Sequence, residues 1–509
     1  MVAAVRSAAL IGIDAYDVTV EVDAVPGLPQ WTIVGLPLGA VKESRDRVGA
    51  ALVNSGYAIP PRRITVNLAP ADIRKDGTAF DLPIALGILV ATGQLPPSSI
   101  EGRMFVGELG LDGQLRGVRG ALSIARGAAA SSGSVELVVP PCNLAEAGRV
   151  SSLRLSGPPT LTALAAELRT GLLTRACQQE MSFVQRTEPL DFRDVIGQES
   201  AKRALEVAAA GGHNLMLIGP PGAGKTMLAR RLPGILPELS EAESLEVIAI
   251  HSVAGKLTAD ALTGCARPFR APHHSISSAG LIGGGSAPRP GEVSLAHNGV
   301  LFLDEMLEFP RHVLDGLRQP LEDGQVTISR AAAAVNFPAR FTLVGATNPC
   351  PCGRLGDPTG RCTCSTTDIE RYAGRMSGPL ADRMDMHVTV GAVALPDLSA
   401  PETGESTAVI RERIGRAREC QRRRFARVRG VSCNAHATGR WIDSNGEIAN
   451  NARDVLQSAA ERLALSARGY HRVLKVARTI ADIDGSASVE PPHVAEALRY
   501  RQIASRAGS

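Results

Sequence analysis

The chain has 509 residues, and with 44% hydrophobic residues it can form about three domains with buried cores. Its net charge of +4 is too small to identify a partner. It has no apolar run long enough to span a bilayer, no secretion signal at its N-terminus, and only nine cysteines. These features exclude a membrane-spanning or disulfide-stapled protein, and we expect it in the cytoplasm without a membrane partner.

Residues 1–168 are predicted to form the first domain of a multidomain α/β protein, with an α/β or α+β fold of their own. Alternating apolar and polar residues predict strands, and helical spacing of apolar residues predicts helices. Asp112-Gly113 between short apolar flanks predicts a hairpin. Strands are expected at 18–22, 31–34, 64–68 and 137–140, and helices at 41–52 and 82–92.

Three further regions follow the first domain. Residues 169–191 are weakly patterned and are interpreted as a linker, 192–396 as a nucleotide-binding domain, and 397–509 as a domain with helical periodicity. The stretch 411–429 is strongly basic. It either lines a path for a DNA backbone or is a solvated helix face.

A complete phosphate-binding loop occupies residues 219–226, between the apolar run 215–218 and a predicted helix that starts at Met227. Glycines in such a loop let backbone N–H groups close around phosphate oxygens, the lysine reaches the β- and γ-phosphates, and the hydroxyl ligates Mg²⁺. The chain is therefore predicted to bind a nucleoside triphosphate. The loop consists of Gly219, Pro220, Pro221, Gly222, Ala223, Gly224, Lys225 and Thr226.

A second apolar run, 299–303, delivers two carboxylates, Asp304 and Glu305, at its end. Ligands of parallel sheets bind at the carboxyl ends of the strands. We expect Asp304 to hold Mg²⁺ through water as the acidic partner of Thr226, and Glu305 to act as general base on the attacking water.

A third apolar run, 341–347, ends at Asn348. This side chain is predicted to orient the water or to contact the γ-phosphate. The alternative is an asparagine that serves only the turn before Pro349.

Two C-x-C pairs follow Asn348 directly. Four thiolates at this spacing predict one tetrahedral, structural zinc site. Because C-x-C departs from the usual C-x₂-C, free thiols remain an alternative, as does a redox disulfide, which a reducing compartment disfavours. The four residues are Cys350, Cys352, Cys362 and Cys364.

The polar, glycine-rich segment 266–291 contains His273 and His274. These histidines either serve a function or pack against the neighbouring loop. A metal site made by the pair is disfavoured, because adjacent residues point apart in most backbone conformations.

Together these motifs resemble those of the AAA+ ATPases, and in particular the ComM/YifB family of magnesium-chelatase-like proteins. The resemblance covers nearly the whole chain. It rests on residues 34–37, 40–45, 80–87, 106–110, 267–270, 272–275, 295–305, 348–353 and 477–482.

The resemblance implies a Lon-protease-like N-terminal domain of the ribosomal S5 domain 2-like type, an AAA+ core and a C-terminal helical lid. Proteolysis would need a serine in a Gly-Pro-Ser-Ala-Gly-like turn, and in the matching turn at 75–81 Ala79 stands at the nucleophile position. We therefore expect no protease activity, and a role for this domain in assembly or DNA contact.

The resemblance also implies a ring, usually a hexamer, with each ATP site at a subunit boundary. Arg383 resembles the arginine that a neighbour contributes to the transition state, and its alternative is an ion pair with Asp382 or Asp385. Arg468 resembles the lid arginine that reads the γ-phosphate, with Arg472 as a rival.

Further nucleotide contacts are implied at Ile196 and Gly197, which resemble the segment that flanks adenine and favour ATP, and at Met227, which follows the loop. Related motors project the segment matching 266–291 into the ring's pore. They also grip nucleic acid with a hairpin like the one predicted at 326–338, where Arg330 would contact a phosphate.

The predicted function is an ATP-hydrolysing ring motor on single-stranded or branched DNA, of the helicase or branch-migration type, in recombination or DNA uptake. Its cofactors are ATP, Mg²⁺ and structural zinc. The alternatives are a magnesium-chelatase-like metal-insertion subunit, which does not need the first domain, the cysteines or the basic stretch, and a protein-remodelling chaperone.

Overall fold

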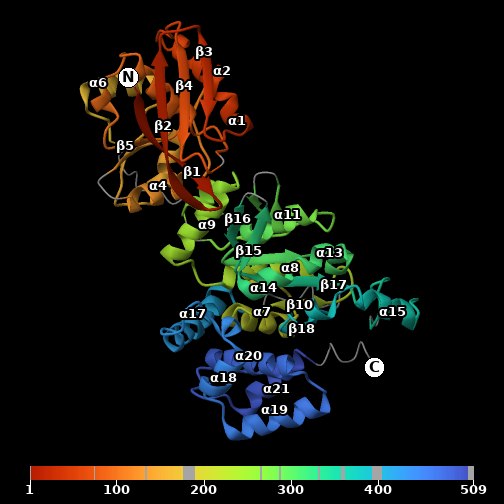
Figure 1. Ribbon diagram of the computed structural model, residues 1–509. Coiled ribbons are helices and arrows are strands. Elements are labelled where there is room, and N and C mark those ends of the chain that lie inside the picture. The colour runs from red at the N-terminus through yellow and green to blue at the C-terminus, as the bar shows by residue number, and fades with distance from the viewer. Residues whose placement is uncertain are drawn as a thin grey trace.

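The computed structural model describes residues 2–73, 75–131, 135–175, 190–263, 266–285, 288–330, 333–356, 362–391 and 404–501. An N-terminal domain, a central α/β domain and a C-terminal helical domain follow one another along the molecule (Figure 1). Most of the predicted linker lies outside the described residues, at 176–189, and the boundaries at 168, 191 and 396 stay predictions. No helix in the described ranges is long and apolar enough to cross a membrane.

The N-terminal domain is built on a seven-stranded mixed sheet in the order β3-β4-β2-β1-β5-β8-β9. Its longest pairing is antiparallel and joins β1 to β2. The strands are β1 (Ala3–Ile11), β2 (Asp14–Val25), β3 (Gln30–Val34), β4 (Arg63–Ala69), β5 (Arg103–Phe105), β8 (Glu136–Val138) and β9 (Arg154–Ser156). The helices are α1 (Gly39–Lys42), α2 (Ser44–Asn54), α3 (Asp81–Ala91), α4 (Ala121–Ala130), α5 (Leu144–Ala147) and α6 (Leu161–Thr170).

Helix α3 forms the centre of this domain, since every residue from Asp81 to Ala91 is buried. It packs on β1 and β2, where Gly87 permits close approach because a Cβ there would lie 2.4 Å from Val22. The predicted strands and helices are confirmed, with helix 41–52 divided into α1 and α2 at Glu43. The hairpin at Asp112-Gly113 is also confirmed, as β6 (Glu108–Leu109) and β7 (Leu115–Arg116).

The central domain contains a five-stranded parallel sheet in the order β11-β14-β17-β10-β18. Its strands are β10 (Leu215–Ile218), β11 (Phe269–Arg270), β14 (Gly299–Leu303), β17 (Phe341–Thr347) and β18 (Met386–Thr389). The longer helices are α7 (Glu199–Gly211), α8 (Lys225–Ile235), α9 (Glu241–Val253) and α15 (Thr366–Ala373). Shorter ones are α10 (Ala259–Thr263), α11 (Ser278–Ile282), α12 (Glu292–Leu295), α13 (Arg311–Asp315), α14 (Arg318–Asp323) and α16 (Gly378–Ala381).

Two antiparallel ribbons extend from this domain. One joins β15 (Gln325–Arg330) to β16 (Ala333–Pro338) and confirms the predicted hairpin. The other is short and joins β12 (Gly283–Gly284) to β13 (Arg289–Pro290).

The C-terminal domain is helical, as predicted, and lies below the central sheet in Figure 1. Its apolar side chains join those of α7 and α8 in one hydrophobic cluster, so that Leu205 of α7 shares a core with Ile414 and Leu474. Such a shared core fixes this domain to the central one. Its helices are α17 (Thr407–Arg424), α18 (Gly439–Asn445), α19 (Asn450–Arg462), α20 (Ala467–Ile483) and α21 (Pro491–Arg499).

Among the residues that the structure describes, the N-terminal domain touches the central domain at α9 and at β16. Helix α4 meets α9, where the Gly120 N–H donates to the Ser252 hydroxyl at 2.7 Å and Leu122 packs on Ile248. The turn between β1 and β2 meets β16, since a Cβ on Gly12 would lie 2.8 Å from Val335. The β15–β16 hairpin therefore has the N-terminal domain against its side.

Candidate nucleotide and metal sites

The phosphate-binding loop lies between β10 and α8, as its sequence predicts. The Thr226 hydroxyl donates to Asp304 Oδ2 at 2.7 Å, which joins the loop to the end of β14. Lys225 Nζ donates to the Gly219 carbonyl at 2.7 Å and to Asn348 Oδ1 at 3.2 Å. Three strands distant in sequence thus deliver these residues to one edge of the sheet, because the carboxyl ends of parallel strands lie together.

The loop is suited to phosphate by its electrostatics. Burial lowers the pKa of Lys225, while the charges of Asp304 and Glu305 work in the opposite direction. Gly222 and Gly224 have φ of +78° and +87°, a conformation that other residues rarely adopt. Helix α8 starts at Lys225, so its N-terminal dipole favours negative charge at the same point.

Glu305 has a left-handed backbone, with φ of +48°, and its side chain is 59% exposed. Its N–H donates to Asp304 Oδ1 at 3.0 Å. A carboxylate held at the sheet edge but open to water is placed to accept a proton from that water.

His274 is the residue that sequence reasoning left unassigned and that the fold brings to the site. Its Nδ1 lies 3.7 Å from Glu305 Oε2, and its ring lies 4.1 Å from that of His273. The feature that could have identified His274 is its position just after β11, the strand that pairs with β14. Neither histidine belongs to a group of ligands close enough to hold a metal among the described residues.

The segment proposed to flank adenine lies against the same loop. Gly197 has φ of +64°, and the next residue, Gln198, donates from its side-chain amide to the Ala223 carbonyl at 3.5 Å. Ile196 is half-buried, and Met227 is 37% exposed on the first turn of α8.

The three predicted arginines lie at the opposite edge of the sheet. Arg383 precedes β18, and its carbonyl accepts from the Asn214 amide at 3.0 Å just before β10. Asn214 lies just before β10, at the amino edge of the sheet, and Gly219 lies just after it, at the carboxyl edge. Because a strand rises about 3.3 Å per residue, the two edges are roughly 16 Å apart. The Arg383 guanidinium pairs with Glu322 of α14 rather than with Asp382 or Asp385.

Arg468 and Arg472 differ in their surroundings although both lie on α20. Arg472 is half-buried and pairs with Asp385 at 3.3 Å. Burial lowers the pKa of Arg472, and the nearby charges of Arg383 and Arg468 add to this effect. Arg468 is exposed and forms no hydrogen bond or ion pair with any residue that the structure describes. It is therefore free to bind a ligand, whereas Arg472 is committed to Asp385.

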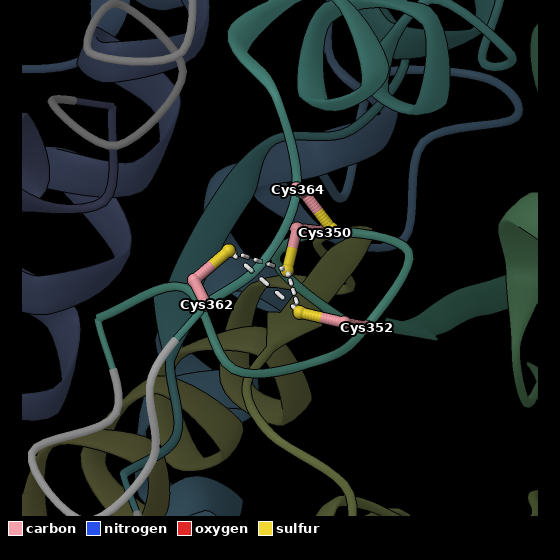
Figure 2. Close-up of side chains that lie close together, drawn as sticks. All are labelled: Cys350, Cys352, Cys362 and Cys364. Atoms are coloured by element: carbon pink, nitrogen blue, oxygen red, sulfur yellow. Dashed lines mark hydrogen bonds between the residues drawn. The ribbon is translucent and has the colours of Figure 1, made fainter.

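The four cysteines converge beyond the end of β17 (Figure 2). Their sulfur atoms all lie within 4.8 Å of one another. The Cys350 sulfur is 3.4 Å from that of Cys352 and 3.7 Å from that of Cys362. Tetrahedral zinc–sulfur bonds of about 2.3 Å place sulfur atoms about 3.8 Å apart, so the group fits zinc. Backbone hydrogen bonds from Thr363 and Arg354 lower the pKa of Cys352 to about 6, whereas burial and the neighbouring sulfur atoms raise the pKa values of Cys362 and Cys364. A bound metal would offset the repulsion among the four thiolates.

Arg330 is the last residue of β15 and is paired with Ala333 of β16, at the end of the hairpin.

The basic stretch 411–429 has a mixed role. On α17, Arg418 donates to the Ala209 carbonyl of α7 at 2.8 Å and Arg424 pairs with buried Asp482 at 2.5 Å. Arg418 thus ties the C-terminal domain to the central one and Arg424 ties α17 to α20, so only part of the stretch remains for other partners.

Comparison with known proteins agrees with this geometry. A family model described as "Magnesium chelatase, subunit ChlI" matches residues 191–398, "Subunit ChlI of Mg-chelatase" matches 20–143, and "Magnesium chelatase, subunit ChlI C-terminal" matches 404–501. The competence protein ComM of Haemophilus influenzae is 45% identical over 98% of this chain and 97% of its own length.

The chain belongs to the ComM/YifB family of magnesium-chelatase-like proteins. YifB of Salmonella typhimurium is likewise 45% identical over 98% of this chain and 97% of its own length. Lon protease 2 of Bacillus subtilis is 30% identical over 35% of this chain and 36% of its own length, which fits a Lon-like segment. Family membership implies an ATPase that uses Mg²⁺.

Proposed function

We propose that this protein is an ATP-driven ring motor that acts on DNA, with helicase or branch-migration activity. The observation that carries the ATPase is the 2.7 Å hydrogen bond from Thr226 to Asp304 beside exposed Glu305. It joins the phosphate-binding loop to the acidic residues that hydrolysis needs.

The residues divide the chemistry among them. Lys225 and the loop N–H groups bind the phosphates, and Asn348, whose Oδ1 is 3.2 Å from Lys225 Nζ, orients the attacking water. Glu305 takes a proton from that water as it attacks. Thr226 and Asp304 would hold Mg²⁺, which would neutralise charge on the phosphates.

A neighbouring subunit completes this site in our proposal. Arg383 and Arg468 each act on the charge of Arg472, and Arg383 lies at the sheet edge that is roughly 16 Å from the edge with the loop. They cannot reach their own γ-phosphate across the sheet, but in a closed ring they can reach the next subunit's. Ile196, Gly197 and Met227 would then contact the nucleotide within one subunit.

Two observations support DNA as the substrate: the β15–β16 hairpin and the name of a relative. ComM, which is 45% identical to this chain, is named a competence protein. The β15–β16 ribbon carries Arg330 at its end, where a ring would present it toward the pore with segment 266–291. Contact with phosphates is sequence-independent, as a translocating motor needs.

We also assign zinc to Cys350, Cys352, Cys362 and Cys364. The described sulfur separations suit a closed tetrathiolate site, and thiolates select zinc over Mg²⁺.

The test measures ATP turnover by the full chain at equal subunit concentration with no DNA, single-stranded DNA or forked DNA. We expect DNA to raise turnover severalfold, with DNA binding that weakens as salt increases. A hexamer that hydrolyses ATP but binds no DNA at low salt would overturn the proposal that DNA is the substrate. Stimulation by an unfolded protein instead of DNA would indicate a chaperone.

A second candidate is a metal-insertion ATPase, and the match of three chelatase subunit models favours it. Its test adds the protein to chelatase partner subunits that lack their own ATPase. Restored insertion of Mg²⁺ into a porphyrin would establish it.

A further inference from the structure

We propose that the tetrathiolate site controls ATP hydrolysis: the bound metal holds Asn348 and the phosphate-binding loop in their working positions, and its loss stops turnover. This inference rests on the proposed zinc and ATPase functions. The segment 350–364 is called the cysteine knuckle below, and its described residues are 350–356 and 362–364.

The first link runs from the metal site to Asn348. Cys350 is fully buried and follows Asn348 by two residues, directly beyond β17. Asn348 Oδ1 is the side-chain partner of Lys225. A metal that fixes Cys350 therefore limits where the Asn348 side chain can lie, because only Pro349 separates them.

The second link runs from the knuckle to the phosphate-binding loop. Gly353 has φ of +76°, and its N–H donates to the Cys350 carbonyl at 2.9 Å in a tight turn. A Cβ at this position would lie 2.7 Å from Pro221 Cδ, closer than such atoms approach. The knuckle thus packs its backbone directly on the loop that binds phosphate.

The third link runs through α15, which begins two residues after Cys364. Arg375, just beyond this helix, donates to Glu308 at 2.8 Å and to the Leu307 carbonyl at 3.3 Å. Those residues follow Glu305 by only a few positions. The knuckle and α15 therefore contact all three segments that carry the hydrolytic residues.

The knuckle has little else to hold it in place. Among the described residues of 350–372, only Cys350 and Tyr372 are buried apolar side chains. Such a segment lacks a hydrophobic core, so metal–thiolate bonds supply its order. Removing the metal should release the knuckle while the three domain cores remain intact.

The first experiment removes the metal. We expect the wild-type chain to bind one zinc ion, measured by elemental analysis, and to give a tetrahedral thiolate spectrum after cobalt substitution. The double variant Cys352→Ser/Cys364→Ser should no longer bind the metal. Its kcat should be at least tenfold lower than that of the wild type. The controls are Cys142→Ser and Cys420→Ser, which change exposed cysteines outside the knuckle. Both variants should bind the metal and keep the kcat of the wild type.

The second experiment keeps the metal and disturbs only its contact with the loop. Gly353→Ala retains all four ligands but forces a Cβ against Pro221, so kcat should fall severalfold at unchanged zinc content. Gly356→Ala is the matched control, because Gly356 has φ of +77° and no heavy atom within 4 Å of the new Cβ. Its kcat should stay near that of the wild type.

The outcomes separate the proposals. A wild-type chain without ATPase activity would overturn the proposed function, and a chain without metal would overturn the zinc assignment. Normal kcat in the metal-free double variant, or equal kcat in the Gly353→Ala and Gly356→Ala variants, would overturn the control inference alone.

Discussion

At the scale of single residues, surroundings rather than residue type decide the role. Arg468 and Arg472 are one helical turn apart on α20, yet Arg468 is exposed and Arg472 is half-buried against Asp385. The sequence offered both as the residue that reads the γ-phosphate. The ion pair with Asp385 removes Arg472 from that role, because a ligand that drew Arg472 away would leave the Asp385 carboxylate without this partner.

We expect Glu305→Gln to bind ATP as the wild type does and to hydrolyse it about 10²- to 10⁴-fold more slowly, because only the proton acceptor is lost. Single-turnover hydrolysis and binding of a fluorescent ATP analogue would measure this. Glu412→Gln, which changes an exposed glutamate of α17 away from the site, is the control. Normal hydrolysis by Glu305→Gln would place the base elsewhere.

Asp385 gives a prediction about pH. Its burial opposes the charged form, but His213, whose Nδ1 lies 3.7 Å from Asp385 Oδ2, the charge of Arg472 and the hydrogen bond from the Asn214 N–H outweigh this and lower the pKa of Asp385 to about 2. An exposed aspartate has a pKa of about 3.9, so the stabilisation is complete above pH about 4 and is lost as the pH falls through about 2.

Asp385→Asn should therefore reduce the free energy of unfolding by roughly 2 to 3 kcal/mol at pH 7, with a smaller reduction at pH 3. Urea unfolding followed by Trp441 fluorescence measures it, because Trp31→Phe removes the only other tryptophan. Asp454→Asn changes an exposed aspartate and should have little effect. An equal loss at pH 7 and pH 3 would contradict the assignment.

At the scale of elements, the basic helix α17 shows why a charge run cannot be interpreted from sequence alone. Arg418 and Arg424 face the central domain and Asp482, whereas Arg416, Arg422 and Arg423 are exposed beside glutamates of the same helix. The hairpin differs, since the sequence predicts it at 326–338 and the structure confirms it as β15 and β16.

The hairpin, rather than α17, should therefore carry the DNA contact. Arg330→Ala should weaken DNA binding similarly for all sequences and reduce the slope of log affinity against log salt by about one. Arg416→Ala, on the exposed face of α17, is the control and should change neither. A larger effect from Arg416→Ala would assign the DNA path to the helix.

At the scale of the whole molecule, the proposed ring would divide the ATP site between subunits along the two edges of the central sheet. The loop, Asp304 and Asn348 lie at the carboxyl edge, and Arg383 lies at the amino edge with Arg468 close by. One subunit cannot bring these edges together, because the strands between them are rigid and paired.

We expect Lys225→Ala and Arg383→Ala to be nearly inactive alone and to regain activity when mixed before ring assembly. In a random 1:1 mixture, about a quarter of the boundaries pair an intact loop with an intact arginine, so about a quarter of wild-type turnover should return. Mixing Lys225→Ala with Glu305→Gln is the control and should restore nothing. Full activity of Arg383→Ala alone would contradict the shared site.

The sequence by itself determined the phosphate-binding loop, the acidic pair, the cysteine pattern and most strands and helices. These follow from local spacing, since backbone geometry and side-chain chemistry over a few residues fix them. Only the tertiary structure decided that His274 lies beside Glu305, that Arg383 pairs with Glu322, and that Gly353 rests on Pro221. Those contacts join segments far apart in the chain, and the packing of β11, β14 and β17 into one sheet creates them.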